Sequence, residues 1–219
     1  MGREADVPVR MKRSGSAVWL RAWSAACALF VLAGCAEKPF RYAASDLSGR
    51  LQSSTAVLPF DNASTDLDAE KICREAVIRE LEGRGYRVVS REATDAALKR
   101  IGVTDGGQLP AYKPQELGRA TGTPGLVYGT IEEFMSQNIG VYANRKVVLR
   151  LRWVDADSGE RLFEDVGTGA SREFSKPEKA TEAFLKNLAR KAADKARGIF
   201  LKAEAEKAAA QALKELPRR

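Results

Sequence analysis

Histidine, the side chain most often used for proton transfer near neutral pH, does not occur in this chain of 219 residues. Its absence excludes Ser-His-Asp and Cys-His nucleophile pairs, imidazole metal sites and histidine pH switches. The stretches "GRG", "DGG" and "TGTPG" lack the order of a phosphate-binding or dinucleotide-binding loop. Carboxylates and cysteines are therefore the side chains left to consider for chemistry.

Four carboxylates, Asp61, Asp66, Asp68 and Glu70, lie close enough in sequence to suggest a calcium loop. Their spacing is not that of an EF-hand, and the central glycine is missing. Capping and dipole pairing at a helix start explain Asp66 and Asp68 without a metal. We therefore predict no metal site here.

Glu132 and Glu133 are neighbours on an expected strand, where successive side chains point to opposite faces. We accordingly expect no facing carboxylate pair of the kind that glycosidases use. Cys73 shares a helical face with Val77 and Leu81, which favours a small buried apolar side chain over a reactive thiol. The sequence predicts a protein that is not an enzyme, with no catalytic residue and no cofactor.

The remaining cysteine of interest is Cys35, which follows an export-signal pattern. A charged stretch, residues 12–21, precedes an apolar run, residues 22–32, about half the ~20 residues that a membrane-spanning helix needs. Residues 1–10 contain acidic side chains and fit a signal poorly, so that translation could start at Met1 or at Met11.

Directly after that run, Leu32-Ala33-Gly34-Cys35 resembles the lipobox of bacterial lipoproteins. The resemblance implies cleavage between Gly34 and Cys35, and fatty acyl chains such as palmitate on Cys35. Several chains anchor a protein stably, because each buried CH₂ contributes ~0.8 kcal/mol. Ala36 after the cysteine resembles lipoproteins sorted to the outer membrane. We expect a lipid-anchored protein that faces the periplasm.

The predicted domain organisation follows from composition. Residues 1–34 form the signal peptide, and residues 35–53 mix Pro, Gly, Ser and charges like a lipidated tether. Residues 54–201 form one α/β domain, and residues 202–219 a basic helical tail.

The formal charge of +7 is unevenly distributed. Residues 1–34 hold five basic and two acidic residues, which leaves 31 minus 27, or +4, for the remainder. Residues 176–219 hold twelve basic and six acidic residues, which leaves 19 minus 21, or −2, for residues 35–175. Nucleic acid is not an expected partner of an exported protein, so the basic segment favours anionic envelope components or an acidic protein.

The first half of the predicted domain alternates strands and helices. We expect a buried strand over residues 54–60, a helix capped by Thr65 and Asp68 that runs to about Glu82, a strand over 86–90, and helices over 91–102 and 113–122. This β-α-β-α order predicts parallel strand pairing covered by helices.

The second half predicts antiparallel strands. A strand over residues 125–135 is followed by one over 145–155, in which apolar and basic side chains alternate with period two. One face carries Val147, Leu149, Leu151 and Trp153, and the other carries Lys146, Arg150 and Arg152. "DADSG" predicts a tight turn into a returning strand over residues 160–174.

From Lys176 onward the sequence favours a long C-terminal helix. Ala180, Phe184, Leu188, Ala192, Ala196 and Ile199 follow helical spacing, which predicts that this face packs on the sheet. After Leu201 there is little to bury, so a projecting helix or a frayed tail is expected. Candidate partner-binding residues are Arg150 and Arg152 on the strand, and Lys202, Lys207 and Lys214 on the tail; a solvated charged face is the alternative.

Four stretches, "STAVLPFDNASTD", "LEGRGYRVVS", "GLVYGTIEEF" and "VVLRLRWVDADSGERLFED", occur in an order and spacing that resemble the uncharacterised bacterial lipoproteins related to the GNA vaccine antigen. The resemblance covers about residues 40–170. It extends to the curli-export lipoprotein and to the lipoprotein activators of peptidoglycan synthases. The implied fold is α/β (α+β), with a mixed sheet flanked by helices in an anticodon-binding-like sandwich.

The resemblance implies no established catalytic residue. It favours a non-catalytic protein-binding or assembly module of the cell envelope, with envelope proteins as partners. The alternatives are an oligomeric subunit of a curli-export-like secretion channel, and therefore a homo-oligomer, or a docking activator of a peptidoglycan synthase.

Overall fold

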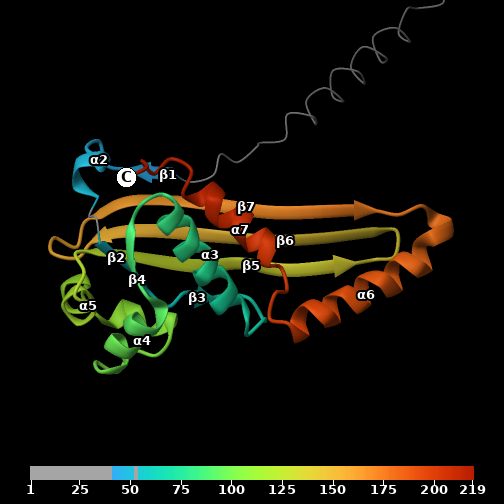
Figure 1. The fold of residues 1–219 in the computed structure, drawn as a ribbon, viewed down its shortest axis with the longest axis horizontal. Coiled ribbons are helices and arrows are strands. Elements are labelled where there is room, and N and C mark those ends of the chain that lie inside the picture. The colour runs from blue at the N-terminus through green and yellow to red at the C-terminus, as the bar shows by residue number, and fades with distance from the viewer. Residues whose placement is uncertain (1–40, 52–53) are drawn as a thin grey trace, which may run out of the picture. The chain divides into compact units, whose positions relative to one another are not determined.

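A computed structural model describes residues 41–51 and 54–219, so the predicted cleavage site and Cys35 lie outside the described residues. The elements, shown in Figure 1, are β1 (Arg41–Ala43), α2 (Leu47–Arg50), β2 (Ser54–Val57), β3 (Asp61–Asn62), α3 (Ala69–Gly83), β4 (Arg87–Val89), α4 (Arg91–Lys99), η1 (Gly106–Ala111), α5 (Pro114–Thr121), β5 (Gly125–Asn138), β6 (Tyr142–Asp155), β7 (Arg161–Phe174), η2 (Pro177–Lys179), α6 (Ala180–Ala196) and α7 (Lys202–Ala212).

The strands form one mixed sheet in the order β1-β7-β6-β5-β2-β4, with β3 beside β5. β2 pairs in parallel with β4 and with β5, as the alternating first half predicts. β5, β6 and β7 pair antiparallel through long hairpins, as the period-two pattern predicts. The predicted α/β class, with a mixed sheet flanked by helices, is confirmed.

Helices cover both faces of the sheet. The odd-numbered residues of β6, from Val147 to Trp153, are buried with α3 and α7, and we call this side the α7 face. A second core on the opposite side, the η1 face, joins Leu126 of β5 to Leu98 of α4 and Leu117 of α5. Figure 1 shows α3 and α7 side by side across the long strands.

The C-terminal helical segment is confirmed, but the predicted roles of its two parts are reversed. The segment breaks before α7 at Leu201, a non-glycine residue with φ of 57°. α7 buries Ala205, Ala208, Ala209 and Ala212 completely, whereas α6 has no fully buried residue. The prediction of a projecting or frayed tail is therefore wrong.

Small residues explain the reversal. A Cβ built on Gly169 would lie 1.8 Å from the carbonyl oxygen of Glu204, and one on Gly167 would lie 1.9 Å from that of Ala208. Two glycines of β7 thus admit the backbone of α7 to direct contact with the strand. Alanines, which contribute little to a hydrophobic pattern, make the tightest helix contact on this face.

The prediction that the Phe184 stripe of α6 packs on the sheet is also wrong. The half-buried positions of α6 are Ala180, Ala183, Asn187, Arg190, Lys191 and Asp194. Phe184 and Leu188 are 40% and 53% exposed. The helix is therefore rotated relative to the prediction, with a largely polar side inward.

The residues after α7 are also fixed in place. The Tyr86 hydroxyl donates to the carbonyl of Pro217 at 2.9 Å, and the backbone N–H of Arg219 donates to the carbonyl of Arg84 at 2.8 Å. Leu213 and Leu216 are buried in the core of the α7 face. The C-terminal residues therefore belong to the domain.

The domain starts earlier than residue 54. β1 pairs antiparallel with β7, with Arg41 opposite Asp165, and Leu51 is buried in the core. The Arg41 Nε lies 2.9 Å from an oxygen of the buried Asp165 carboxylate. The prediction of a tether over residues 35–53 is therefore wrong for residues 41–51.

The predicted cap of the first long helix differs as well. α3 begins at Ala69 rather than near Thr65, and the Asp68 side chain makes no capping hydrogen bond. Asp66 instead accepts from the backbone N–H of Asp68 at 3.2 Å. The capping pattern thus marks the turn before the helix, not its first residue.

The contact between β7 and α7 yields a stability prediction. Replacing Gly169 with Ala forces a Cβ into the backbone of α7, and we expect the free energy of unfolding to fall by about 2–3 kcal/mol. Gly83→Ala is the matched control, since a Cβ there meets no atom within 4 Å. Urea unfolding of the chain from Ala36 onward, followed by the fluorescence of its sole tryptophan, Trp153, measures both. Equal stability of the two variants would contradict the close approach.

Candidate binding groove

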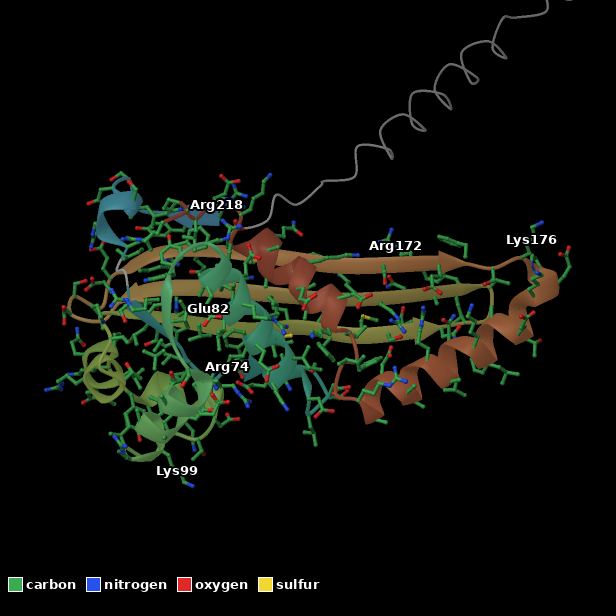
Figure 2. The ribbon with its side chains drawn as sticks, viewed as in Figure 1. Arg74, Glu82, Lys99, Arg172, Lys176 and Arg218 are labelled. Carbon is green, nitrogen blue, oxygen red and sulfur yellow. The ribbon has the colours of Figure 1, made fainter. Side chains whose placement is uncertain are left out.

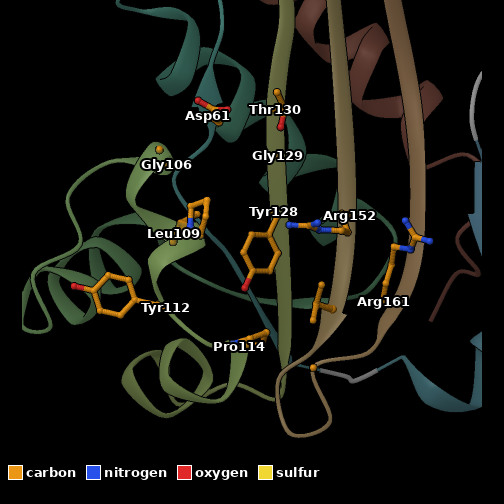
Figure 3. Close-up of a pocket in the computed structure, with 14 residues that line it drawn as sticks. Asp61, Gly106, Leu109, Tyr112, Pro114, Tyr128, Gly129, Thr130, Arg152 and Arg161 are labelled. Atoms are coloured by element: carbon orange, nitrogen blue, oxygen red, sulfur yellow. The ribbon is translucent and has the colours of Figure 1, made fainter.

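A groove of about 740 Å³ lies on the η1 face, where the long strands emerge beside η1. Figure 3 shows strands β5, β6 and β7 as its floor and η1 as its wall. The residues that line it are Asp61, Gly106, Gly107, Leu109, Pro110, Tyr112, Pro114, Tyr128, Gly129, Thr130, Arg152, Val154, Gly159 and Arg161. The groove combines aromatic, proline and arginine side chains.

The wall is fixed by local hydrogen bonds and by one buried ring. Asp105 caps η1 by accepting from the N–H of Gly107 at 2.7 Å. A Cβ on Gly106 would lie 2.3 Å from the carbonyl carbon of Phe60, and one on Gly129 would lie 2.5 Å from the Phe60 ring. Phe60 therefore joins η1 to β5, and both contacts require glycine. The position of the groove wall is therefore set by the packing of the fold.

Arg152 and Tyr128 form the polar centre of the floor. They are directly opposite each other on β6 and β5, and the Arg152 guanidinium carbon lies 4.8 Å from the centroid of the Tyr128 ring. Arg152 forms no ion pair with any carboxylate of residues 41–51 and 54–219. Its N–H donors are therefore available to a ligand.

Burial raises the pKa of Tyr128 above its ordinary value, and the nearby Arg152 charge offsets part of that rise. The phenol therefore stays protonated at neutral pH and can donate a hydrogen bond. The two side chains thus offer hydrogen-bond donors beside an aromatic surface.

Arg150, only two residues from Arg152, has a different environment. It lies 2.7 Å from Glu132 on β5 and 3.6 Å from Glu164 on β7, and Glu164 also lies 2.6 Å from Arg161. These four side chains form a charge ladder across three strands. Arg150 is therefore held within the sheet, whereas Arg152 faces the groove.

The prediction that Glu132 and Glu133 point to opposite faces of the sheet is wrong. The register of β5 shifts between Ile131 and Glu133, because a β-bulge inserts one extra residue. Glu132 then pairs with Arg150 and Glu133 with Lys146, each at 2.7 Å. Both glutamates therefore lie on the η1 face, but each has a cation as its partner.

Two carboxylates of the acidic cluster, Asp66 and Glu70, bind separate cations. Asp66 lies 2.7 Å from Lys195, and Glu70 lies 3.4 Å from the buried Arg74. Arg74 also approaches Asp95 at 2.7 Å and donates from Nε to the carbonyl of Val57. Within the described part of the chain, no three potential metal ligands lie together.

The predicted partner-binding residues do not form one site. Lys202, Lys207 and Lys214 belong to α7 and the turn after it, on the α7 face, whereas Arg150 and Arg152 are on the η1 face. The η1 wall could not be predicted from the sequence, because its glycines and prolines indicate only turns. Tyr128 could have been found by aligning the predicted strands, since it pairs directly with Arg152.

The fold and the groove define a single-sheet α/β domain with an open groove that is lined by aromatic and cationic side chains. The chain belongs to the family described as "Putative lipoprotein GNA1162-like", which matches residues 42–214. The predicted family is thereby confirmed, and it places the chain among lipoproteins of the bacterial cell envelope. Among the described residues, no helix is long and apolar enough to cross a membrane.

Solved structures share this fold. The crystal structure of lipoprotein GNA1162 from Neisseria meningitidis is 21% identical and matches 65% of this chain and 99% of its own, with a TM-score of 0.50. The PelC dodecamer from Paraburkholderia phytofirmans is 14% identical and matches 82% of this chain and 98% of its own, with a TM-score of 0.51. A weaker similarity is to the LpoB C-terminal domain from Escherichia coli, which is 16% identical and matches 54% of this chain and 81% of its own, with a TM-score of 0.36. No curated protein matches the chain.

Two arginines should differ sharply in their contribution to stability. Arg74 is 1% exposed, and Arg74→Met leaves Asp95 and Glu70 without their cation. Both carboxylates are partly solvated, so we expect a loss of about 2–3 kcal/mol, below the range for a fully buried pair. Arg152→Ala should change the free energy of unfolding by less than ~0.5 kcal/mol, because that side chain is exposed. Urea unfolding tests both, and a large loss for Arg152→Ala would make Arg152 a structural residue.

Cys73 should be chemically inert in the folded protein. It is fully buried in α3, and burial raises the pKa of its thiol far above the ordinary value. The reactive thiolate is then scarce at pH 8. In the chain from Ala36 onward, where Cys73 is the only cysteine, we expect Ellman's reagent to react orders of magnitude faster in urea than in buffer. Rapid reaction of the native protein would show that α3 opens readily.

Proposed function

We propose that this protein is a non-catalytic lipoprotein, anchored through Cys35 to the periplasmic side of the outer membrane, that binds another envelope protein through the groove. The observation that carries the proposal is the Arg152–Tyr128 pair, a guanidinium without a carboxylate partner among the described residues, on the floor of an open groove.

The chemistry of the groove favours a protein ligand. Tyrosine and arginine are enriched at the energetic centres of protein interfaces, where they combine apolar area with directional hydrogen bonds. Leu109, Pro110 and Pro114 add an apolar wall that a side chain of the partner can contact. We infer that the partner inserts a segment with a carboxylate next to an apolar residue, the carboxylate pairing with Arg152.

The anchoring part of the proposal rests on the lipobox-like sequence before Cys35 and on the family. β1 begins at Arg41, six residues after Cys35, so that the lipid would hold the domain close to the membrane. A short tether restricts the partners to proteins in or near that membrane.

A second candidate function is a subunit of a homo-oligomeric assembly, such as a secretion channel. It is favoured by the PelC structure, which is described as a dodecamer. The molar mass of the chain from Ala36 onward, measured by light scattering over a range of concentrations, separates the two. A monomer supports the docking module, and a stable closed oligomer supports the subunit. Docking to a peptidoglycan synthase is a special case of the first function.

The groove is tested by site-specific photo-crosslinking in the native host. A photoreactive residue in place of Thr130, on the groove, should cross-link to one envelope protein, identified by mass spectrometry. The same probe at Lys207, exposed on the opposite face, should not. Arg152→Ala should abolish the cross-link, because the partner's carboxylate loses its cation. A cross-link that survives Arg152→Ala would contradict the assignment.

The anchor is tested independently of the groove. Cys35→Ala should prevent lipidation and release the protein from the membrane fraction, and the mature wild-type protein should carry the mass of a lipid on Cys35. Membrane attachment that is unchanged in Cys35→Ala would overturn the anchoring part alone.

A further inference from the structure

Apolar side chains gather at the end of the long strands, away from the groove. Eight large apolar side chains are exposed in the described part of the chain, and six of them belong to this region. We call these six the apolar tip: Ile139, Val141, Phe174, Phe184, Leu185 and Leu188. Ile139 and Phe174 are 72% and 79% exposed. Isolated exposed apolar residues need no explanation, but several gathered at one end of a domain suggest an interaction surface.

The tip has a defined backbone. The N–H of Ile139 donates to the carbonyl of Tyr142 at 2.9 Å, and the N–H of Ser175 donates to that of Val141 at 2.8 Å. The rings of Tyr142 and Phe174 are 4.9 Å apart. The Asn138 side chain donates to the carbonyl of Phe184 at 3.3 Å, which joins α6 to the hairpin. The apolar side chains are therefore presented by a hydrogen-bonded protrusion.

Basic side chains surround the tip. Residues 172–197 contain eight basic and four acidic residues. Arg190 pairs with Glu173 at 2.8 Å, but Lys176, Lys179 and Lys186 form no ion pair with the described carboxylates. Figure 2 shows Arg172 and Lys176 toward the end of the molecule, where β7 leads into α6. The surface thus combines exposed Phe, Ile and Leu side chains with cations that lack partners.

That combination suits the interface of an anionic lipid bilayer. Phe and Leu side chains partition into the boundary between headgroups and acyl chains, while Lys and Arg attract acidic headgroups. We propose that the apolar tip inserts shallowly into an anionic membrane surface, as a second membrane contact besides the lipid. The inference rests on the proposed lipid anchor at Cys35, but the vesicle experiment below tests the apolar tip without that lipid.

The direction of the chain supports this placement. β1 runs antiparallel to β7, with Arg41 opposite Asp165 and Ala43 opposite Phe163, so Arg41 stands at the end of β1 that is nearer to Phe174. Phe174 is nine residues beyond Asp165, a distance of about 30 Å along a strand. The chain from Cys35 to Arg41 reaches about 20 Å when extended. A lipid on Cys35 would therefore orient the domain so that the apolar tip is directed toward the membrane.

A second copy of the chain is a less suitable occupant. An interface in which the same patch meets itself would bring Lys176, Lys179 and Lys186 of both copies together, and none of these has an intramolecular ion pair with a described carboxylate to reduce the repulsion. Lipid headgroups, in contrast, provide the opposite charge.

Vesicle sedimentation tests the proposal with the chain from Ala36 onward, which contains all the described residues and lacks Cys35. We expect binding to vesicles that contain phosphatidylglycerol, weaker binding to pure phosphatidylcholine, and loss of binding as salt rises. The double variant Phe174→Ser, Leu185→Ser should bind the anionic vesicles at least about tenfold more weakly. Lys176→Glu with Lys179→Glu should also weaken that binding by about tenfold or more.

Leu67→Ser is the matched control. Leu67 is 95% exposed but lies before α3, outside the apolar tip, so vesicle binding should be unchanged. Circular dichroism should confirm that each variant is folded. Arg152→Ala should also retain vesicle binding, which separates this surface from the groove.

Three results would overturn the proposal. They are absence of binding to anionic vesicles, equal binding by the tip variants and by Leu67→Ser, and dissociation of an oligomer by Phe174→Ser with Leu185→Ser in light scattering. The last result would make the tip an interface between copies. Since this test uses no lipidated protein, each of these results leaves the Cys35 and groove experiments intact.

Discussion

The close contact between α7 and β7 governs the arrangement of the other elements. Gly167 and Gly169 leave room for the backbone of α7, and its alanines fill the centre of one sheet face. Because that position is occupied, α6 lies outside it and keeps its apolar stripe in solvent. The residues after α7 then reach Arg84 and Tyr86 beside α3. The two glycines thus allow α7, rather than α6, to close the core on this face.

The sequence was sufficient for those parts of the fold that depend on local pattern. Alternating strands and helices predicted the parallel half, and the period-two pattern of β6 predicted the antiparallel half. The wrong predictions for α6 and α7 have a common physical cause. Which helix packs on the sheet depends on the residues that face it, more than on the hydrophobic content of the helix. Alanines of α7 make tight contacts because glycines lie opposite, whereas Phe184 lies on the outer side of its helix. The strand before residue 54 has only three residues and a charged end, too few for a periodic signal.

Register separates the roles of neighbouring arginines. Arg150 and Arg152 have the same residue type and point to the same face, so the sequence analysis predicted the same partner-binding role for both. Glu132 on β5 lies 2.7 Å from Arg150, whereas the residue opposite Arg152 is Tyr128. One arginine is thus neutralised within the sheet, and the other stacks on a ring in an open groove. The residue that lies opposite or beside each arginine on β5 thus decides which cation is left for a ligand, and the residue types of β6 alone do not reveal it.

The pairing of β1 also has a mechanical consequence. Tension on the chain before Arg41, directed toward the Phe174 end, runs along the axis of β1 rather than across it. Such a pull loads the hydrogen bonds between β1 and β7 together, in shear, instead of opening them one at a time as in peeling. The Arg41–Asp165 ion pair lies at the first residue to receive the load. The β1–β7 pairing would thus resist unfolding most strongly when the chain before Arg41 is pulled along the axis of β1.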